Sequence, residues 1–272
     1  MRVLGVLGYP VAHSLSPAMH NAALRALGIP AVYGAFEVPP DLLPQAMVGV
    51  RALGIGGLSV TIPHKETVML YLEEIDPVAR KIGAVNTVVN REGRLWGTNT
   101  DWIGVKRSLE EAGLNLRGRR AAVVGAGGAA RAVVFALREA GAEVEVYNRT
   151  LERAQALVQS LGGRAFPLSE ISQASGEVII QTTSVGLKSW ESPVPKEVFH
   201  NFRAAMDLVY VPLRTRFLAE AEAAGCLTID GLKMLVYQGA EQFRLFTGKN
   251  PPLDLMYQAA LERLKKHGEE KN

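Results

Sequence analysis

The chain has 272 residues, which is more than one typical compact core and less than two large domains. Hydrophobic residues make up 48% and charged residues 21%, as in ordinary globular proteins, and the formal net charge of +3 suits small anionic ligands. The basic residues are scattered, which argues against nucleic-acid binding, and the single cysteine excludes intrachain disulfides and cysteine-based metal sites.

The amino-terminal segment lacks the pattern of a signal peptide, because Tyr9-Pro10 interrupts its short apolar run. No apolar run approaches the ~20 residues that span a bilayer. No ligand-spaced cluster is formed by the five histidines, His13, His20, His64, His200 and His267. We therefore expect a cytoplasmic monomer or homodimer with a small-molecule substrate and without metal, membrane or nucleic-acid partners.

Short apolar runs alternate with helical patterns through the first hundred residues. Residues 3–7 predict a buried strand, and an amphipathic helix is expected over 17–27, with Gly28 at its carboxyl-terminal end. The next expected elements are a strand, a helix, a strand that ends at Pro63 and a hairpin with Glu92-Gly93 in its turn, at 31–38, 42–53, 57–62, and 85–90 with 94–97.

The alternation becomes more regular after a helix expected over 102–112. Its spacing is that of βαβ units, which predicts a parallel sheet with helices on both faces. The strands are expected at 121–124, 144–147, 178–182 and 205–209, with a helix at 151–161. Beyond Gly231 the pattern is helical, over 233–247 and 253–264, and we expect these last helices to return to the first part of the chain.

A glycine-rich turn, Gly-x-Gly-x-x-Ala, stands between the strand at 121–124 and a following helix. Gly125 permits the tight turn, Gly127 lets the backbone approach a pyrophosphate, and Ala130 lets helix and strand pack closely. The amino end of the helix offers unpaired N–H donors to phosphates. The turn therefore predicts a dinucleotide site whose phosphate contacts come from Gly125, Ala126, Gly127, Gly128 and Ala129.

The end of the next strand indicates which dinucleotide binds. A site for NAD would carry Asp or Glu there, whereas this chain has Asn148, Arg149 and Thr150, with Arg153 one helical turn later. Guanidinium groups suit the oxygens of a 2′-phosphate, so NADP is the expected cofactor. The alternative is that Thr150 caps the helix and both arginines are solvated.

We therefore expect an α/β fold of two domains. The first, comprising 1–101 plus 237–272, would be an N-terminal substrate-binding and catalytic domain with a mostly parallel sheet. The second, 102–236, would be a Rossmann-type NADP-binding domain.

Polar residues gather at the expected strand ends of the first domain. Ser14 and Ser16 precede a helix start that attracts anions, although Ser16 next to Pro17 also fits an ordinary N-cap. Thr61 and Lys65 follow a strand, where α/β proteins bind ligands, but a lysine is more often solvated.

Two further polar residues fit the same crevice. Asp101 stands at a helix start, where Asp is also a common cap, and Asn86 lies at the start of a strand, where Asn is rare. Together these signals indicate a polar crevice with one lysine and one carboxylate.

These motifs resemble those of the shikimate dehydrogenase family nearly end to end. They include Ser-Leu-Ser-Pro at 14–17, Val-Thr-Ile-Pro-His-Lys at 60–65, Gly-Ala-Val-Asn-Thr at 83–87 and Gly-Thr-Asn-Thr-Asp at 97–101. The other matching segments are 125–130, 148–150, 183–186, 207–210 and 231–238. The chain departs from the usual family pattern at Ser59, Leu187 and Thr215-Arg216, which leaves affinity and finer substrate preference open.

The resemblance implies an NADPH-dependent, reversible reduction of 3-dehydroshikimate to shikimate. It implies that Ser14 and Ser16 bind the substrate carboxylate and that Lys65 and Asp101 lie beside the reacting oxygen. The ring hydroxyls would be held by Thr61, Asn86 and Gln238, with Tyr210 also against the substrate. The nicotinamide half of the cofactor would lie along Thr183, Val209, Gly231 and Met234.

Three alternatives remain at this point. A quinate or mixed quinate/shikimate dehydrogenase would use the same chemistry, but such enzymes more often use NAD. A non-catalytic NADP-binding sensor is disfavoured by the intact Lys65 and Asp101. A folate-type dehydrogenase of similar shape would lack the paired serines.

Overall fold

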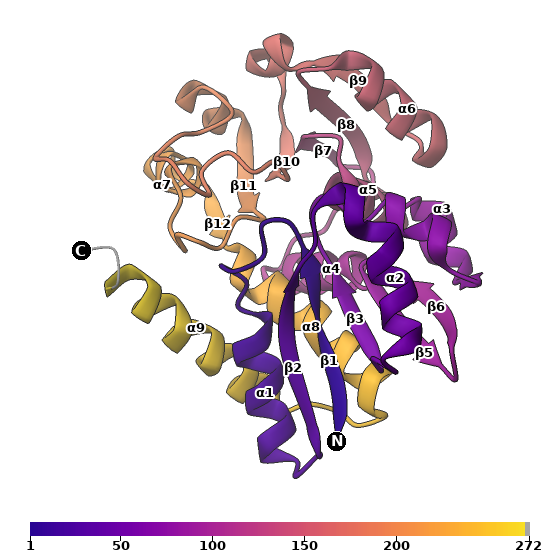
Figure 1. Ribbon diagram of the computed structural model, residues 1–272. Coiled ribbons are helices and arrows are strands. Elements are labelled where there is room, and N and C mark those ends of the chain that lie inside the picture. Colours follow the sequence, from indigo (N-terminus) through magenta and orange to yellow (C-terminus); the bar gives the residue numbers. More distant parts are fainter. Residues whose placement is uncertain (270–272) are drawn as a thin grey trace. The chain divides into compact units, whose positions relative to one another are not determined.

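The computed structural model describes residues 1–269, and the side chains of residues 1–266 (Figure 1). The chain forms two compact units. The first holds Met1–Thr100 together with the chain from Val236 onward, and the second holds Asp101–Leu235. Each unit is built on its own six-stranded sheet.

The elements of the first unit come mainly from the start of the chain. They are β1 (Arg2–Gly8), α1 (Ser16–Ala26), β2 (Ala31–Glu37), η1 (Pro40–Leu42), α2 (Leu43–Ala52), β3 (Gly57–Val60), η2 (Thr67–Tyr71), β4 (Glu74–Ile75), α3 (Pro77–Ile82), β5 (Thr87–Arg91) and β6 (Arg94–Thr98). Two long helices complete the chain, α8 (Gly231–Thr247), which begins in the second unit, and α9 (Leu253–Glu269).

The second unit contains the regular βαβ series. Its elements are α4 (Asp101–Glu111), β7 (Arg120–Val124), α5 (Gly128–Glu139), β8 (Glu143–Asn148), α6 (Leu151–Leu161), β9 (Arg164–Pro167), η3 (Leu168–Gln173), β10 (Gly176–Gln181), η4 (Lys196–Asn201), β11 (Phe202–Asp207), α7 (Arg216–Ala223) and β12 (Leu227–Ile229).

The first sheet has the order β2-β1-β3-β5-β6-β4. The pairs β1–β2, β1–β3 and β4–β6 are parallel, whereas β3–β5 and the hairpin β5–β6 are antiparallel. The hairpin turns at Glu92 and Gly93, whose φ angles of 53° and 88° are those that a tight two-residue turn requires. The predicted hairpin and its turn are confirmed.

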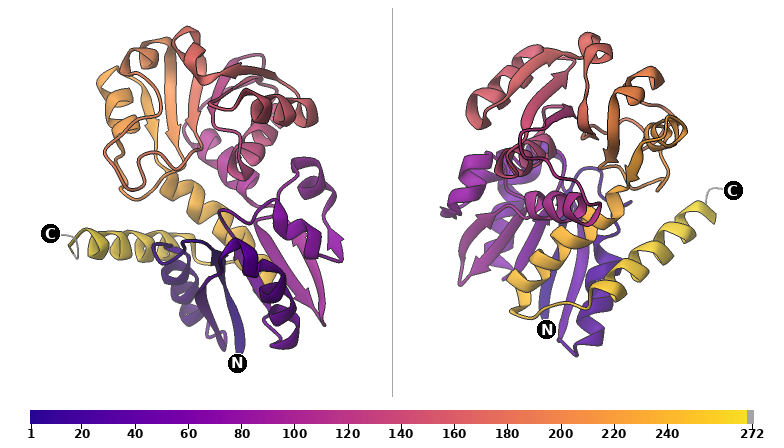
Figure 2. Two further views of the ribbon diagram at one scale, coloured as in Figure 1. Left: turned by 45° about the horizontal axis from the view of Figure 1, so that its top comes forward. Right: turned by 180° about the vertical axis from the view of Figure 1, so that it is seen from behind.

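Helices cover both faces of this sheet. Apolar residues of α2, η2 and α3 pack on one face, and α1 packs on β1 and β2. The helix α8 approaches β3 so closely that a Cβ atom at Gly57 would lie 2.4 Å from the ring of Phe246. The helix α9 lies beside α1, as the views in Figures 1 and 2 agree. The last helices therefore do pack with the first unit, as the sequence predicts.

The second sheet is parallel throughout, in the order β12-β11-β10-β7-β8-β9. Numbered from β7, this is the order 3-2-1-4-5-6 of a Rossmann fold. Residues of α4, α5 and α6 form one apolar core with the sheet, and residues of η3, η4 and α7 form a second. The predicted α/β fold with helices on both faces of a parallel sheet is confirmed.

Two predicted strands end elsewhere than expected. The strand expected over 57–62 ends at Val60, and the chain then turns through a cis peptide bond between Ile62 and Pro63. The strand expected over 205–209 covers Phe202–Asp207 instead. It ends there because the Asp207 side chain accepts a hydrogen bond from the Val209 N–H and turns the chain.

Three short strands and two short helices, α3 and α7, are not among the predicted elements. The strands β4, β9 and β12 all lie at sheet edges, where one neighbour suffices and a long apolar run is not needed. The helix α3 had a readable signal. Asp76 caps it by accepting from the N–H groups of Val78 and Ala79, Pro77 opens it, and Gly83 closes it with φ 74°.

Candidate active site

The glycine-rich turn lies where β7 passes into α5. Gly125 has φ +115°, and a Cβ atom there would lie 2.5 Å from Thr182 Oγ1, so only glycine fits. At Gly127, the N-cap of α5, an added Cβ would meet no atom within 4 Å. Ala130 is fully buried against the sheet. The amino end of α5 is therefore open for a phosphate to approach its N–H groups.

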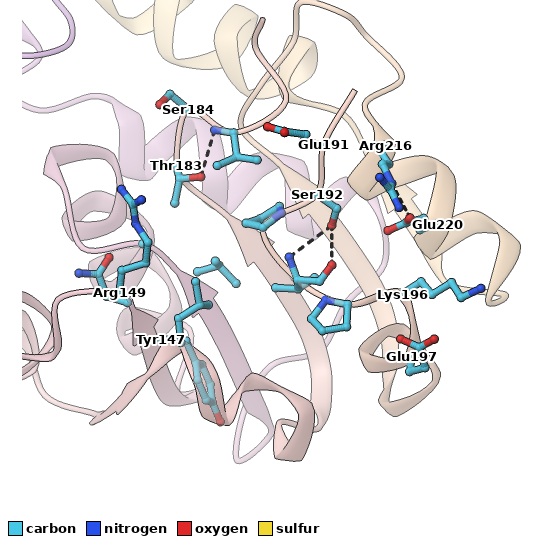
Figure 3. A pocket seen from close by; sticks show the side chains of 18 residues that line it. Tyr147, Arg149, Thr183, Ser184, Glu191, Ser192, Lys196, Glu197, Arg216 and Glu220 are labelled. Atoms are coloured by element: carbon cyan, nitrogen blue, oxygen red, sulfur yellow. Dashed lines mark hydrogen bonds and ion pairs between the residues drawn. The ribbon is translucent and has the colours of Figure 1, made fainter. Parts of the chain in front are cut away.

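A pocket of about 730 Å³ lies beside this turn, at the carboxyl ends of β7, β8 and β10. Four of the predicted cofactor residues line it: Gly125, Asn148, Arg149 and Thr183. Figure 3 shows Arg149 on one wall and the Arg216–Glu220 ion pair, 2.7 Å apart, on the opposite side. Arg153 is exposed on α6 and does not line the pocket.

The carboxylate nearest the end of β8 is used within the protein. Glu145 is buried and accepts hydrogen bonds from Tyr147 Oη at 2.8 Å and Arg164 Nη2 at 2.6 Å. Burial, together with Glu145, raises the pKa of Tyr147. Thr150 is the N-cap residue of α6, but its side chain makes no capping hydrogen bond. The β8 end of the pocket therefore presents Asn148 and Arg149 rather than a carboxylate, which fits a 2′-phosphate.

Other pocket residues were not predicted. They belong to the segment after β10 and to α7: Ser184, Val185, Glu191, Ser192, Pro193, Val194, Pro195, Lys196, Glu197, Arg216 and Glu220. The available signal was the Ser-Pro-Val-Pro run at 192–195, which is typical of a loop at a ligand site.

The predicted nicotinamide residues lie in the loops after β10 and β11 and at the start of α8. Gly231 is the first residue of α8. A Cβ atom there would lie 2.7 Å from the carbonyl oxygen of Leu208, so the start of α8 lies close against the turn that follows β11. Asp207 is fully buried and accepts from Thr215 Oγ1 at 2.7 Å, and burial raises its pKa to about 7. Val209 and Met234 are buried in the same unit. Tyr210 follows directly in the loop after Val209.

The paired serines lie at the start of α1. The helix begins at Ser16 and Leu15 occupies the N-cap position, so the interpretation of Ser16 as the N-cap is wrong. Ser14 Oγ accepts a hydrogen bond from the Ser16 N–H at 3.2 Å. The two serines are therefore in contact at a helix start whose N-cap side chain makes no capping bond.

Asn86 joins several of the predicted substrate residues in the first unit. Its Nδ2 donates to Gln238 Oε1 at 3.2 Å, and its Oδ1 accepts from the Thr100 N–H at 2.8 Å. The preceding Val85 N–H donates to the Lys65 carbonyl at 2.7 Å. The structure thus brings Asn86, Gln238 and the backbone of Lys65 together. Asp101, which opens α4 and is buried, follows Thr100 directly in the chain.

Thr61 directly follows β3 in the chain. Its N–H donates to the Leu7 carbonyl, which continues the pairing of β1 with β3 by one residue. Gln242, one helical turn after Gln238, belongs to the same buried polar group and was missed, although glutamines at positions i and i+4 share a helix face.

Two features of the described residues bear on other classes of function. Among the side chains that the structure describes, those of residues 1–266, no group of three or more His, Cys, Asp or Glu residues could hold a metal ion. Within residues 1–269, no helix is both long enough and apolar enough to cross a membrane.

Cys226 is buried, and its Sγ lies 3.2 Å from the Phe199 carbonyl oxygen. Burial raises the pKa of its thiol, as expected for a packing residue.

Three protein-family models match successive parts of the chain. Residues 6–88 match the substrate binding domain of shikimate dehydrogenase, and residues 106–192 match shikimate / quinate 5-dehydrogenase. Residues 231–261 match the C-terminal domain of shikimate 5′-dehydrogenase.

Individual relatives match over almost their whole length. The NADP(+)-dependent shikimate dehydrogenase of Thermococcus kodakarensis is 53% identical over 96% of both chains. That of Symbiobacterium thermophilum is 47% identical over 97% of this chain and 95% of the relative. The shikimate 5-dehydrogenase of Thermus thermophilus, solved in complex with NADP(H) and shikimate, is 48% identical, with a TM-score of 0.89 over 97% of this chain and 100% of that one. Such identity along the whole chain shows that the protein belongs to the shikimate dehydrogenase family.

Proposed function

We propose that this protein is an NADP-dependent oxidoreductase that reversibly reduces 3-dehydroshikimate to shikimate in aromatic amino-acid biosynthesis. One observation carries the proposal. The Rossmann-type sheet presents an open helix start and an arginine-bearing pocket in a chain that is 48% identical to an enzyme solved with NADP(H) and shikimate.

The residues around the pocket fit NADP. The N–H groups at the start of α5, over 125–129, would bind the pyrophosphate, and Arg149, with Asn148, Thr150 and Arg153, would bind the 2′-phosphate. Thr183, Val209, Gly231 and Met234 would line the nicotinamide half. When bound, NADPH supplies the hydride for the reduction.

The first unit would bind the substrate. Ser14 and Ser16 offer two hydroxyls at the start of α1, where the helix dipole favours a carboxylate. Thr61, Asn86 and Gln238 would hold the ring hydroxyls, and Tyr210 would contact the substrate as well. The hydrogen bond between Asn86 and Gln238 supports a shared role.

Lys65 and Asp101 would carry the proton chemistry. As hydride arrives, negative charge develops on the carbonyl oxygen, and the Lys65 ammonium stabilises that charge and donates a proton. Asp101 orients the ammonium. Two hydrogen bonds support this pairing. The Lys65 carbonyl accepts from the Val85 N–H, and the N–H of Thr100, the residue before Asp101, donates to the side chain of Asn86, the residue after Val85.

Initial rates with shikimate and quinate, each measured with NADP and with NAD, test the proposal. We expect shikimate with NADP to have the highest kcat/KM, with a preference of about 10² to 10⁴ over NAD if two charge-assisted hydrogen bonds reach the 2′-phosphate. Equal rates with quinate would indicate mixed specificity. NADP binding without any turnover would indicate a sensor and contradict the proposal.

We place the enzyme in the cytoplasm as a monomer or a homodimer. Fractionation of cells and light scattering of the purified protein test these two points. A membrane-associated or higher-order form would contradict them.

A further inference from the structure

We infer that four buried side chains of the first unit, Tyr33, Ser59, Thr87 and Gln242, are positioning residues. Together with the backbone of Thr100, they hold the Asn86 amide in one orientation and, through Asn86, the end of the Gln238 amide that faces the substrate. The inference rests on the proposed function, in which Gln238 binds the ring, and it names what Gln238 offers: N–H donors for an oxygen lone pair of a hydroxyl or carbonyl group.

We call the hydrogen bonds that join these four side chains to Asn86 and Gln238 the relay. A backbone group at each of two points fixes its direction, and the first is the N–H of Thr100. This N–H lies 2.8 Å from one atom of the Asn86 amide, and because an N–H group only donates, that atom must be the oxygen, Oδ1. The nitrogen, Nδ2, therefore lies on the other side, 3.2 Å from Gln238. Since Nδ2 only donates, Gln238 must turn its oxygen toward Asn86, and its own nitrogen points elsewhere.

The second backbone group is the carbonyl of Asn86. It only accepts, so the Gln242 atom 3.0 Å away must be the nitrogen, Nε2. Gln242 Oε1 then accepts from Ser59 Oγ at 2.6 Å, and Ser59 Oγ in turn accepts from Tyr33 Oη at 2.5 Å. The hydroxyl groups of Tyr33 and Ser59 thus both donate in the direction of Gln242.

Thr87 closes the relay between these two backbone groups. Its Oγ1 accepts from Gln242 Nε2 at 3.1 Å and donates to Asn86 Oδ1 at 2.7 Å. A flipped Asn86 amide would set its nitrogen against the Thr100 N–H and against the Thr87 hydroxyl hydrogen. Thr87 therefore reinforces the orientation that the backbone imposes on Asn86, and through Asn86 on Gln238.

Burial makes this order strict. The side chains of the relay, from Tyr33 to Gln238, are at most 5% exposed, so water does not readily replace a lost partner. A buried network with one member removed leaves a polar atom unpaired, which is costly in a low-dielectric interior. Loss of Thr87 or Gln242 should therefore leave the Thr100 N–H as the main support of the Asn86 amide and loosen the orientation of Gln238.

The test uses Thr87→Val, which keeps the side-chain shape without the hydroxyl, and Gln242→Met, which keeps the length without the amide. For each we expect the KM for shikimate to rise about tenfold, the loss of one buried hydrogen bond, with kcat within about twofold and the Kd for NADPH unchanged. If either variant is too unstable to purify, Tyr33→Phe and Ser59→Ala interrupt the outer part of the relay more gently.

A double-mutant cycle separates positioning from general destabilisation. In a Gln238→Ala background, Gln242→Met should no longer change the KM for shikimate, because its effect passes through Gln238. Ser108→Ala is the matched control. That buried hydroxyl donates to the Gly104 carbonyl within its own helix, α4, at 2.9 Å, so its loss should leave the KM unchanged.

The outcomes are distinct. An unchanged KM in folded Thr87→Val and Gln242→Met, or a Gln242→Met effect that persists in the Gln238→Ala background, would overturn the relay while the proposed function stands. A wild-type protein that does not turn over shikimate would overturn the proposed function, and this role of the relay with it.

Discussion

Gln181 and Asp207 lie opposite each other at the carboxyl ends of the parallel strands β10 and β11, and each side chain binds the loop that follows its own strand. Gln181 Nε2 donates to the Val185 carbonyl at 2.9 Å, and its Oε1 accepts from the Thr183 N–H. Asp207 accepts from the Val209 N–H at 2.9 Å. Both residues are fully buried, so two neighbouring polar groups of the sheet shape both loops proposed to contact nicotinamide.

Replacing Asp207 with Asn should change how stability depends on pH. Burial raises the carboxyl pKa from 3.8 to about 7 in the folded protein. As the pH rises, the carboxyl group therefore loses its proton first in the unfolded state. The unfolding free energy falls between about pH 4 and pH 7 and changes no further, on account of this group, above pH 7. Relative to Asp207→Asn, the wild type should lose up to about 1.4 kcal/mol of unfolding free energy per pH unit in that window. Urea titrations at several pH values measure this; a constant difference would contradict it.

His20 should produce the opposite slope. It is fully buried, neither ring nitrogen has a hydrogen-bond partner among the described residues, and burial lowers its pKa to about 3. The unfolded state takes up the proton first, so stability should fall as the pH drops from about 6.5 toward 3. His20→Leu should flatten this fall. Hydrogen exchange of peptides from the first unit measures it, with the exposed His200→Gln as control, and an unaltered slope in His20→Leu would show that His20 is not responsible.

Arg149 should determine the cofactor preference more strongly than Arg153. Arg149 lines the pocket, whereas Arg153 is exposed on α6 outside the lining. Arg149→Ser should therefore raise the KM for NADP by about 10- to 100-fold and leave that for NAD nearly unchanged, as expected for one charge-assisted hydrogen bond. Arg153→Ser should have a smaller effect. Initial rates with both cofactors decide it, and a larger effect at Arg153 would count against this pocket as the 2′-phosphate site.

Lys65→Ala and Asp101→Ala should each reduce kcat strongly, because loss of general acid–base catalysis typically costs about 10²–10⁴-fold. The Kd for NADPH, measured by fluorescence, should remain unchanged, since neither residue lines the cofactor pocket. Near-normal turnover in either variant would remove that residue from the mechanism.

Gly231→Ala should impair the protein, because the added Cβ would lie 2.7 Å from the Leu208 carbonyl oxygen, a backbone atom that cannot move aside alone. Overpacking of this kind costs about 1–3 kcal/mol, and here it also displaces the turn next to Val209, so the KM for NADPH should rise. Gly49→Ala in α2 is the matched control. Its Cβ would meet no atom within 4 Å, so thermal unfolding should be unchanged or slightly improved. Equal behaviour of the two variants would argue against a steric constraint at Gly231.

The order of the main helices and strands and the dinucleotide turn are predictable from the amino-acid sequence alone. These features depend on local chemistry: apolar periodicity, the glycine at φ +115° in the turn after β7, and the Glu92-Gly93 hairpin turn. Edge strands such as β4 and β12 escaped because two or three residues with a single neighbouring strand leave no periodic signal.

Which polar side chains meet depends on how distant elements pack and could not be predicted from the sequence. Ser59 and Gln242 are 183 positions apart, and their hydrogen bond exists because α8 packs directly on β3. Likewise, the partners of Glu145, Arg164 and Tyr147, are known only from the way β9 packs beside β8. Side-chain pairing of this kind depends on packing between distant elements, which local patterns do not encode.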